Sequence, residues 1–239
     1  MPTTSSHPRS SSTGTPSFTA PARAGRLAYF EGSLPLRWFE GERLRAIREL
    51  VAEDPGHRIL QIGSGAGHVA RMFRHSHVVV VDSHPELLEL ARRNLKDHDV
   101  ELVQGDLESL RFSPRSFDRV ICTQVLEHLE HPERVLERIA ELVKPGGRAI
   151  VTVANAPLSR GVKRVLTSPP LGWVFDTELL GAAGERLHQW TPDEFRRLVS
   201  SRFHVEEQRA LPFAWLPLRV CYLCRVRRTE PLAHGRVES

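Results

Sequence analysis

The stretch that decides the fold reads Arg58-Ile-Leu-Gln-Ile-Gly-Ser-Gly-Ala-Gly-His68, and Val78-Val-Val-Val-Asp82 follows it. An apolar run that breaks into three glycines predicts a buried strand that enters a tight turn. A helix should follow the turn, with Val69 and Met72 on its inner face. The β-branched run predicts a second, parallel strand, which delivers Asp82 to the same edge of the sheet.

The spacing of the glycines separates two kinds of nucleotide site. A dinucleotide-binding turn has its third glycine one position later, where this chain has His68, and a phosphate-cradling loop needs a Gly-Lys-Ser/Thr that is absent here. The pattern G-x-G-x-G therefore suits a ligand without phosphates. Asp82 lies about twenty residues further on, the distance at which such folds present a carboxylate to a ribose diol. An ordinary strand-to-helix turn is the alternative interpretation.

Strands and helices alternate along the rest of the chain, which is typical of an α/β fold with a doubly wound, mostly parallel sheet. The pattern predicts seven strands in a Rossmann-like arrangement, the last two forming an antiparallel hairpin at the edge. Two capping boxes predict helix starts, at Ser83-His-Pro-Glu86 and Thr191-Pro-Asp-Glu194. The expected strands are residues 58–62, 77–82, 100–103, 117–123, 148–153, 203–209 and 220–226. The expected helices are residues 38–52, about 68–74, 83–96, 132–143 and one that opens at 191.

Composition divides the chain into one domain and two tails. Residues 1–25 are rich in Ser, Thr and Pro and contain no acid, so we expect a disordered tail; residues 229–239 form a second one. The domain spans 26–228. The regular pattern lapses over 156–189, and a connection of that length is usually a lid or a binding element.

Charge and cysteine content exclude several classes of protein. The net charge of +4 comes mostly from arginines interleaved with acids, which favours a solvated surface over a nucleic-acid footprint. Three cysteines argue against a disulfide framework. No stretch reads as an integral membrane span or a signal peptide, so we expect a cytoplasmic protein. The oligomeric state is left open.

Six short motifs then occur in a fixed order: Leu60-Gln-Ile-Gly-Ser-Gly-Ala-Gly67, Val81-Asp82, Gln104-Gly-Asp106, Phe117-Asp118, Val125-Leu-Glu-His128 and Leu142-Val-Lys-Pro-Gly-Gly147. Together they resemble the motifs of the class I S-adenosylmethionine (SAM) dependent methyltransferases, over about residues 58–209. His188-Gln-Trp-Thr-Pro-Asp-Glu-Phe195 resembles the small-molecule branch, which includes ubiquinone-pathway O-methyltransferases.

The resemblance implies a part of the cofactor for each matching position. The glycine turn would pack against the methionine part of SAM, Asp82 would accept hydrogen bonds from the ribose, and Asp106 from the adenine amino group. Asp106 as a plain turn residue is the alternative. The cofactor-binding residues expected in this way are Gln61, Gly63, Ser64, Gly65, Gly67, Asp82, Ser83, Asp106, Leu107, Thr123 and Gln124.

Two positions depart from the family, because Gln61 and Gln124 stand where acids are usual. Glutamine can accept a hydrogen bond from the ammonium group of SAM but lacks the charge, a loss of roughly 1 kcal/mol or more where partly buried.

His128 is the candidate general base for an oxygen nucleophile, since it follows a strand at the edge of the site. The alternatives are a structural histidine, or a divalent-cation site shared with Glu127; we assign no metal. Acceptor-binding candidates are Trp38, Trp173, His188 and Trp190, although Trp38 could equally pack on the core and His188 and Trp190 could cap the last helix.

The sequence therefore predicts a SAM-dependent methyltransferase, an enzyme whose partner is a small-molecule acceptor methylated at oxygen. A nucleic-acid methyltransferase is one alternative, although Thr123-Gln-Val-Leu126 replaces the N/D-P-P-Y/F signature of the amino-directed enzymes. A non-catalytic domain that keeps the fold as a binding module is the other, and the two glutamines are its motivation.

Overall fold

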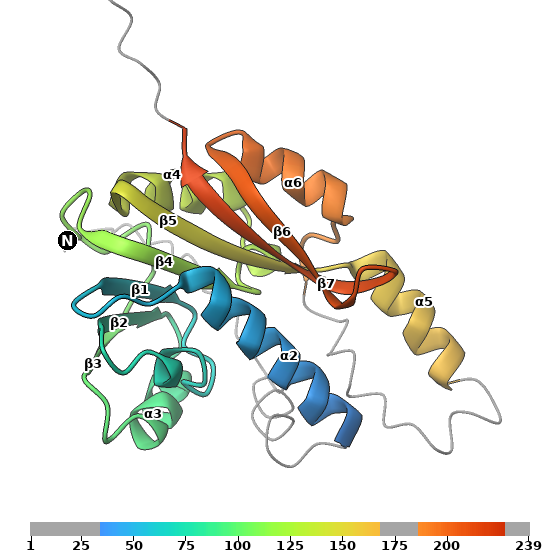
Figure 1. The fold of residues 1–239 in the computed structure, drawn as a ribbon, viewed down its shortest axis with the longest axis horizontal. Coiled ribbons are helices and arrows are strands. Elements are labelled where there is room, and N and C mark those ends of the chain that lie inside the picture. Colours follow the sequence, from blue (N-terminus) through green and yellow to red (C-terminus); the bar gives the residue numbers. More distant parts are fainter. Residues whose placement is uncertain (1–33, 168–185, 228–239) are drawn as a thin grey trace, which may run out of the picture.

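A seven-stranded sheet forms the centre of the molecule, with strand order β3-β2-β1-β4-β5-β7-β6 (Figure 1). The computed structural model describes residues 34–167 and 186–227. The strands are β1 Arg58–Ile62, β2 His77–Asp82, β3 Val100–Gln104, β4 Phe117–Thr123, β5 Val143–Ala154, β6 Phe203–Phe213 and β7 Leu216–Val226. The helices are α2 Leu34–Val51, α3 Pro85–Asn94, α4 Pro132–Leu142, α5 Ala156–Thr167 and α6 Pro192–Ser200, with 3₁₀ turns η1 Ala70–Met72 and η2 Leu126–His128.

The sheet is parallel from β3 to β5, and β7 and β6 complete it in antiparallel orientation. The predicted fold class is thus confirmed. Alternate residues of the central strands enter two separate cores, as expected where helices cover both faces. Leu60 and Val79 lie with α4 and α6 on one face, and Ile59 and Val78 lie with α2, α3 and η1 on the other.

The prediction of a helix after the glycine turn was too long. Only one 3₁₀ turn forms, because the chain becomes extended at Phe73 and buries that ring before β2 begins. Val69 is buried as predicted, whereas Met72 is half-buried.

The capping box predicted at Ser83 was also wrong, whereas the one at Thr191 is present with both of its hydrogen bonds. Proline disfavours helical geometry at the preceding residue, so His84 stays extended and α3 starts one residue late, at Pro85. The hydroxyl of Ser83 lies 3.1 Å from Nδ1 of His84 instead of capping α3.

The predicted lapse of regular structure over 156–189 is wrong for its first third, where α5 forms with Pro157 in its first turn. The remainder, 168–185, lies outside the described residues. Helix α2 begins at Leu34, earlier than the predicted residue 38, and buries Ile47, Leu50 and Val51.

A buried ion cluster joins α2 to β7. Glu40 accepts a hydrogen bond from Nε of Arg43 at 2.7 Å and also pairs with Arg219, whose guanidinium lies over the ring of Phe39. Burial alone would raise the pKa of Glu40, but the two arginines reverse the effect and lower this pKa to about 2. The cluster therefore stabilises the attachment of α2 as long as Glu40 is ionised.

We predict that Glu40→Gln destabilises the protein most at neutral pH. A carboxyl whose pKa falls on folding adds stability above its unfolded value, 4.5, and loses this stability as the pH falls towards about 2. The difference in free energy of unfolding between wild type and variant should be about 3 kcal/mol at pH 7 and should shrink between pH 4.5 and 2. Urea titrations at several pH values measure it. Glu42→Gln, at a half-buried position of α2 where the carboxylate pairs with Arg45, is the control and should change the free energy of unfolding much less.

Candidate functional site

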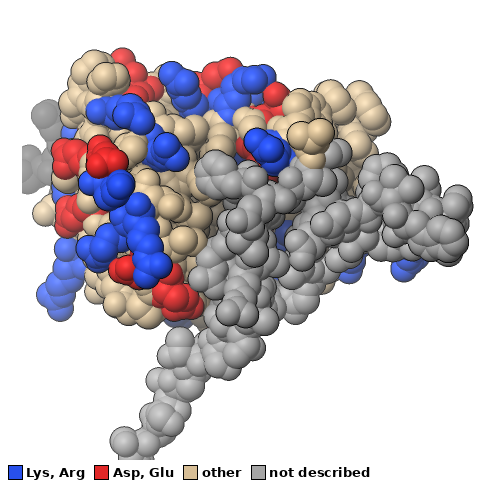
Figure 2. All heavy atoms as spheres, turned by 90° about the horizontal axis from the view of Figure 1, so that it is seen from below, with Lys and Arg blue, Asp and Glu red and all other residues tan. Residues whose placement is uncertain are grey.

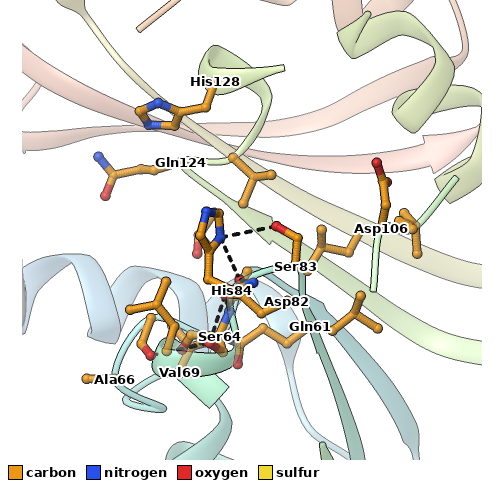
Figure 3. A pocket seen from close by; sticks show the side chains of 18 of the residues that line it. Gln61, Ser64, Ala66, Val69, Asp82, Ser83, His84, Asp106, Gln124 and His128 are labelled. Carbon is orange, nitrogen blue, oxygen red and sulfur yellow. Dashed lines mark hydrogen bonds and ion pairs between the residues drawn. The ribbon is translucent and has the colours of Figure 1, made fainter. Parts of the chain in front are cut away.

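A cavity of about 710 Å³ opens at the carboxyl ends of β1, β2 and β4 (Figure 3). Its position follows from the topology, because β1 and β4 lie side by side where the order of the strands reverses, and ligands of such sheets bind in that crevice. Most residues predicted from the resemblance line it. They are Gln61, Gly63, Ser64, Gly65, Asp82, Ser83, Asp106, Leu107, Thr123, Gln124 and His128.

The three glycines of the turn have three different surroundings, although all have positive φ. A Cβ at Gly63 would lie 2.6 Å from Val125, and one at Gly67 would lie 3.0 Å from Leu95. At Gly65, by contrast, no described atom lies within 4 Å of that position. Gly63 and Gly67 thus permit close packing of the protein, and Gly65 leaves open space on the cavity side. Gly67 does not line the cavity.

Asp82, at the end of β2, is hydrogen-bonded to the glycine turn that follows β1. Its Oδ2 accepts hydrogen bonds from the backbone N–H of Ser64 at 2.7 Å and from the Ser64 hydroxyl at 2.8 Å. Its Oδ1 accepts from the backbone N–H of His84 at 2.9 Å and lies 3.2 Å from the ring Nδ1 of His84. Asp82 therefore points at the glycine turn, as the sequence predicted, and it also holds the start of α3.

Gln61 uses its amide group for the turn itself. Its Nε2 donates to the carbonyl of Gly63 at 2.6 Å, while its buried Oε1 has no hydrogen-bond partner among the described residues. An acceptor without a partner is costly inside a protein, about 1–3 kcal/mol, so a ligand donor would be favourable here.

Gln124 and His128 form the opposite wall, reaching the cavity from the β4 side (Figure 3). Gln124 has φ +54°, a conformation that is uncommon for residues other than glycine, and its N–H donates to the carbonyl of Thr152 on β5. Such outliers cluster at binding sites, where the surrounding structure enforces them.

Asp106 combines the two roles that the sequence left open. Its Oδ1 accepts from the backbone N–H of Glu108 at 3.0 Å, which makes it a turn residue, and it also lines the cavity with the buried Leu107. Its side chain is exposed, so an oxygen remains accessible from the cavity.

Glu127 and His128 differ in their surroundings. His128 lines the cavity, whereas Glu127 is 2% exposed, is absent from the lining, and neither of its carboxyl oxygens has a hydrogen-bond partner in the described chain. Burial raises the pKa of Glu127, and the charges of His128, Arg186 and Arg219 lower it only in part. Within residues 34–167 and 186–227, no three His, Cys, Asp or Glu side chains are grouped as metal ligands would be.

Three of the acceptor-binding candidates lie off the cavity, and Trp173 falls outside the described residues. The rings of His188 and Trp190 stack 4.7 Å apart, and Nε2 of His188 lies 2.9 Å from the carbonyl of Leu129. These contacts hold the start of α6 against η2. Trp38 is 48% exposed and packs on Phe213.

Sequence reasoning missed four polar residues of the lining, Arg43, His68, His84 and Glu86. Arg43 was detectable, because it lies four residues before Ile47 on the inner stripe of α2, where an unexplained charge indicates a buried partner or a site. His68 occupies the position that distinguished the glycine turn from a dinucleotide fingerprint. Its pKa is lowered by burial and, after that, by Arg43 and Arg71.

The strand order, the glycine turn and the acid at the end of β2 together define the fold of the class I SAM-dependent methyltransferases. Comparisons with known proteins agree: residues 60–151 match the sequence model of a family described as "Methyltransferase domain". In its motifs, its fold and the family model that it matches, the chain is similar to the class I SAM-dependent methyltransferases.

Curated relatives share only part of their length with this chain. A ubiquinone biosynthesis O-methyltransferase of Aeromonas salmonicida is 35% identical over 56% of this chain and 59% of its own. A ubiquinone/menaquinone biosynthesis C-methyltransferase of Ectopseudomonas mendocina is 30% identical over 67% of this chain and 64% of its own. The chain spans about half the length of several O-methyltransferase relatives, for example 52% of the Xylella fastidiosa protein.

Solved structures show the same fold at low identity. PH0226 from Pyrococcus horikoshii aligns with a TM-score of 0.63 at 19% identity, over 84% of this chain and 96% of that one. The N-methyltransferase NodS of Bradyrhizobium japonicum, solved with S-adenosylhomocysteine, aligns with a TM-score of 0.58 at 18% identity, over 80% and 88%.

We predict that substitution by alanine mainly lowers stability at Gly67 and mainly lowers ligand affinity at Gly65. Gly67→Ala combines a strained φ of +82° with a close approach to Leu95, so its main effect should be a fall in melting temperature. Gly65→Ala has a φ of +48° and no neighbouring atom to meet, so it should cost only about 1 kcal/mol of stability but place a methyl group beside the cavity. Thermal melts and ligand titrations of both variants distinguish the two effects. If both variants lost ligand affinity in the same proportion to their loss of stability, this assignment would be contradicted.

Proposed function

We propose that the protein transfers a methyl group from SAM to a small-molecule acceptor, at an oxygen. The observation that supports this best is the cavity, which extends from the open side of Gly65 past Asp82 to Asp106 and His128. A cavity of about 710 Å³ is within the size range of ligand sites of this kind.

The residues present fit SAM. Space beside Gly65 would admit the methionine part, and its ammonium group would lie near Gln61, which also lines the cavity. Asp82 would hold the ribose diol, and Asp106 with the backbone of Leu107 would hold the adenine. All of these residues line one cavity, although they come from three separate segments of the chain.

Bound SAM would supply a methyl group on a sulfonium that is already activated as a leaving group. What the chain must add is position and proton transfer. Gln124 and His128 share one wall of the cavity, so an acceptor hydroxyl held there would lie within reach of an imidazole that can take its proton. Glu127, buried directly before His128, adds a carboxyl beneath this wall.

Support for a small molecule comes from the relatives, which are named for ubiquinone biosynthesis. Their names include both O- and C-methyltransferases, so the choice of oxygen rests on the presence of His128 as a base. A nucleic-acid substrate is less well supported, because basic and acidic side chains are interspersed on the face shown in Figure 2.

A non-catalytic binding module is the second candidate, supported by the two uncharged glutamines near the expected ammonium group. Such a module would have the same cavity, and it would bind a nucleoside there without catalysing a reaction. Methyl transfer in the assays below decides between the two.

We predict that S-adenosylhomocysteine raises the melting temperature of the wild-type protein and that Asp82→Ala abolishes the shift. The variant removes every acceptor that the site offers to a ribose at this position.

Asp118→Ala is the matched control. Asp118 also anchors a backbone N–H, that of Arg58, and pairs with Lys144, but it lies off the cavity. The control should melt earlier yet keep the shift, and calorimetry should give the same ranking of affinities. No shift in the wild type at saturating ligand would refute cofactor binding.

We predict that His128→Ala retains binding of S-adenosylhomocysteine but lowers methyl transfer to an oxygen acceptor by about 10²–10⁴-fold. The assay incubates the protein with methyl-labelled SAM and a small-molecule cell extract, and follows labelled products by chromatography. Wild-type labelling with no loss in His128→Ala would exclude His128 as the base. Labelling in neither protein, together with intact binding, would favour the non-catalytic module.

A further inference from the structure

The turn between β6 and β7 is apolar where hairpin turns are usually polar. Residues 210–218 read Ala-Leu-Pro-Phe-Ala-Trp-Leu-Pro-Leu, nine uncharged residues between Arg209 and Arg219. The two turn residues are Ala214 and Trp215, in place of the Gly, Asn or Asp that such turns favour. Trp215 is 76% exposed, so neither turn chemistry nor packing in the core explains it.

The exposed rings at this turn form one continuous surface. Phe213 and Trp215 stack with centroids 5.2 Å apart, and Phe213 also contacts Trp38 of α2 at 5.7 Å. We call Trp38, Phe213 and Trp215 the aromatic ridge. Leu34, at the start of the same helix, is 78% exposed. Apolar surface grouped in this way on a monomer usually marks a contact with a protein or a membrane.

Helix α5 lies beside the ridge and carries positive charge only. Its sequence contains Arg160, Lys163 and Arg164 and no acid. Leu158 and Val162 pack on the core, and the exposed Val165 continues their stripe towards the end of the helix. α5 contacts β7, and the N–H of Asn155, just before α5, donates to Leu218 just after the apolar turn. In Figure 1 the β6–β7 turn lies at the right beside the start of α5, and the start of α2 and the end of α5 lie below it.

We propose that this end of the molecule docks peripherally on an anionic lipid membrane, with the aromatic ridge inserted at the interface and α5 lying on the headgroups. Tryptophan rings favour the membrane–water interface, and a basic helix with an apolar stripe suits an anionic lipid surface. An acidic protein would complement the charge of α5, but a loop tip of stacked rings without hydrogen-bonding side chains matches a lipid interface better. None of the helices in the described part of the chain is long and apolar enough to cross a bilayer, so the contact is at the surface.

The proposal does not depend on methyl transfer, and its test needs neither cofactor nor acceptor. The full-length protein is sedimented with vesicles of phosphatidylcholine alone, or with 30% phosphatidylglycerol added, at low and high salt. We expect binding to the anionic vesicles that weakens as salt rises. Trp215→Ser should reduce the partition coefficient about tenfold or more, because it removes the most exposed ring.

Two double variants with the same change in net charge distinguish docking through α5 from a general electrostatic attraction to the membrane. Arg160→Glu/Arg164→Glu changes α5, and Arg92→Glu/Arg93→Glu makes the same change on the exposed face of α3, which lies elsewhere on the molecule (Figure 1). Only the α5 pair should abolish binding, and melting temperatures confirm that all variants fold. Equal losses from both pairs, no vesicle binding by the wild type, or self-association that Trp215→Ser abolishes without vesicle binding would each overturn the proposal.

Discussion

The site depends on the hydrogen bonds that run from Ser64 to the carboxylate of Asp82. Parallel pairing sets Ile62 beside Val81, and the N–H of Gly63 donates to the carbonyl of Val81 at 2.8 Å. The chain then leaves β1 in a turn whose next N–H and hydroxyl both reach Asp82. One carboxylate thus ends β2, shapes the glycine turn and holds the first residues before α3. The floor of the cavity is therefore held by hydrogen bonds within the chain, which reduces the ordering that binding must otherwise impose.

Buried polar atoms without a hydrogen-bond partner in the described chain lie near both edges of the sheet, with Ser76, His98 and Ser116 at the amino edge. Gln61, Glu127 and Thr152 each hold a buried oxygen that has no hydrogen-bond partner among the described residues, and they lie on or directly after three neighbouring strands, β1, β4 and β5. Each such group costs about 1–3 kcal/mol, and native proteins tolerate few of them. Of Gln61, Glu127 and Thr152, only Gln61 lines the cavity, so the other two carry no argument for a ligand.

The sequence predicted best what local patterns determine. The bounds of β2 and β4 are those expected, because each is an apolar or β-branched run that ends at a polar residue. Prediction failed where two local signals competed, as at Ser83, where the constraint imposed by proline outweighed the capping box. It also failed where Pro157 and Gly161 concealed a helix that packs on β7. The pairing of Glu40 with Arg219 joins residues 179 positions apart, and no local pattern could indicate it. The cavity itself was predictable because every motif that forms it stands at the end of a parallel strand.

Gln61 shows why the loss of an acid need not mean the loss of a site. A carboxylate at this position would face the carbonyl oxygens of Gly63 and Ser64, to which the amide of Gln61 is the donor at 2.6 and 3.5 Å. The glutamine therefore lacks the charge but supplies a donor that shapes the turn, and its acceptor Oε1 is buried. A hydrogen bond to the ammonium group, which is itself charged, keeps part of the attraction that an ion pair would provide. If the glutamine were a relic of a lost activity, nothing would require its amide to bridge the turn. Its geometry therefore favours a cofactor site that is held together differently over one that has decayed.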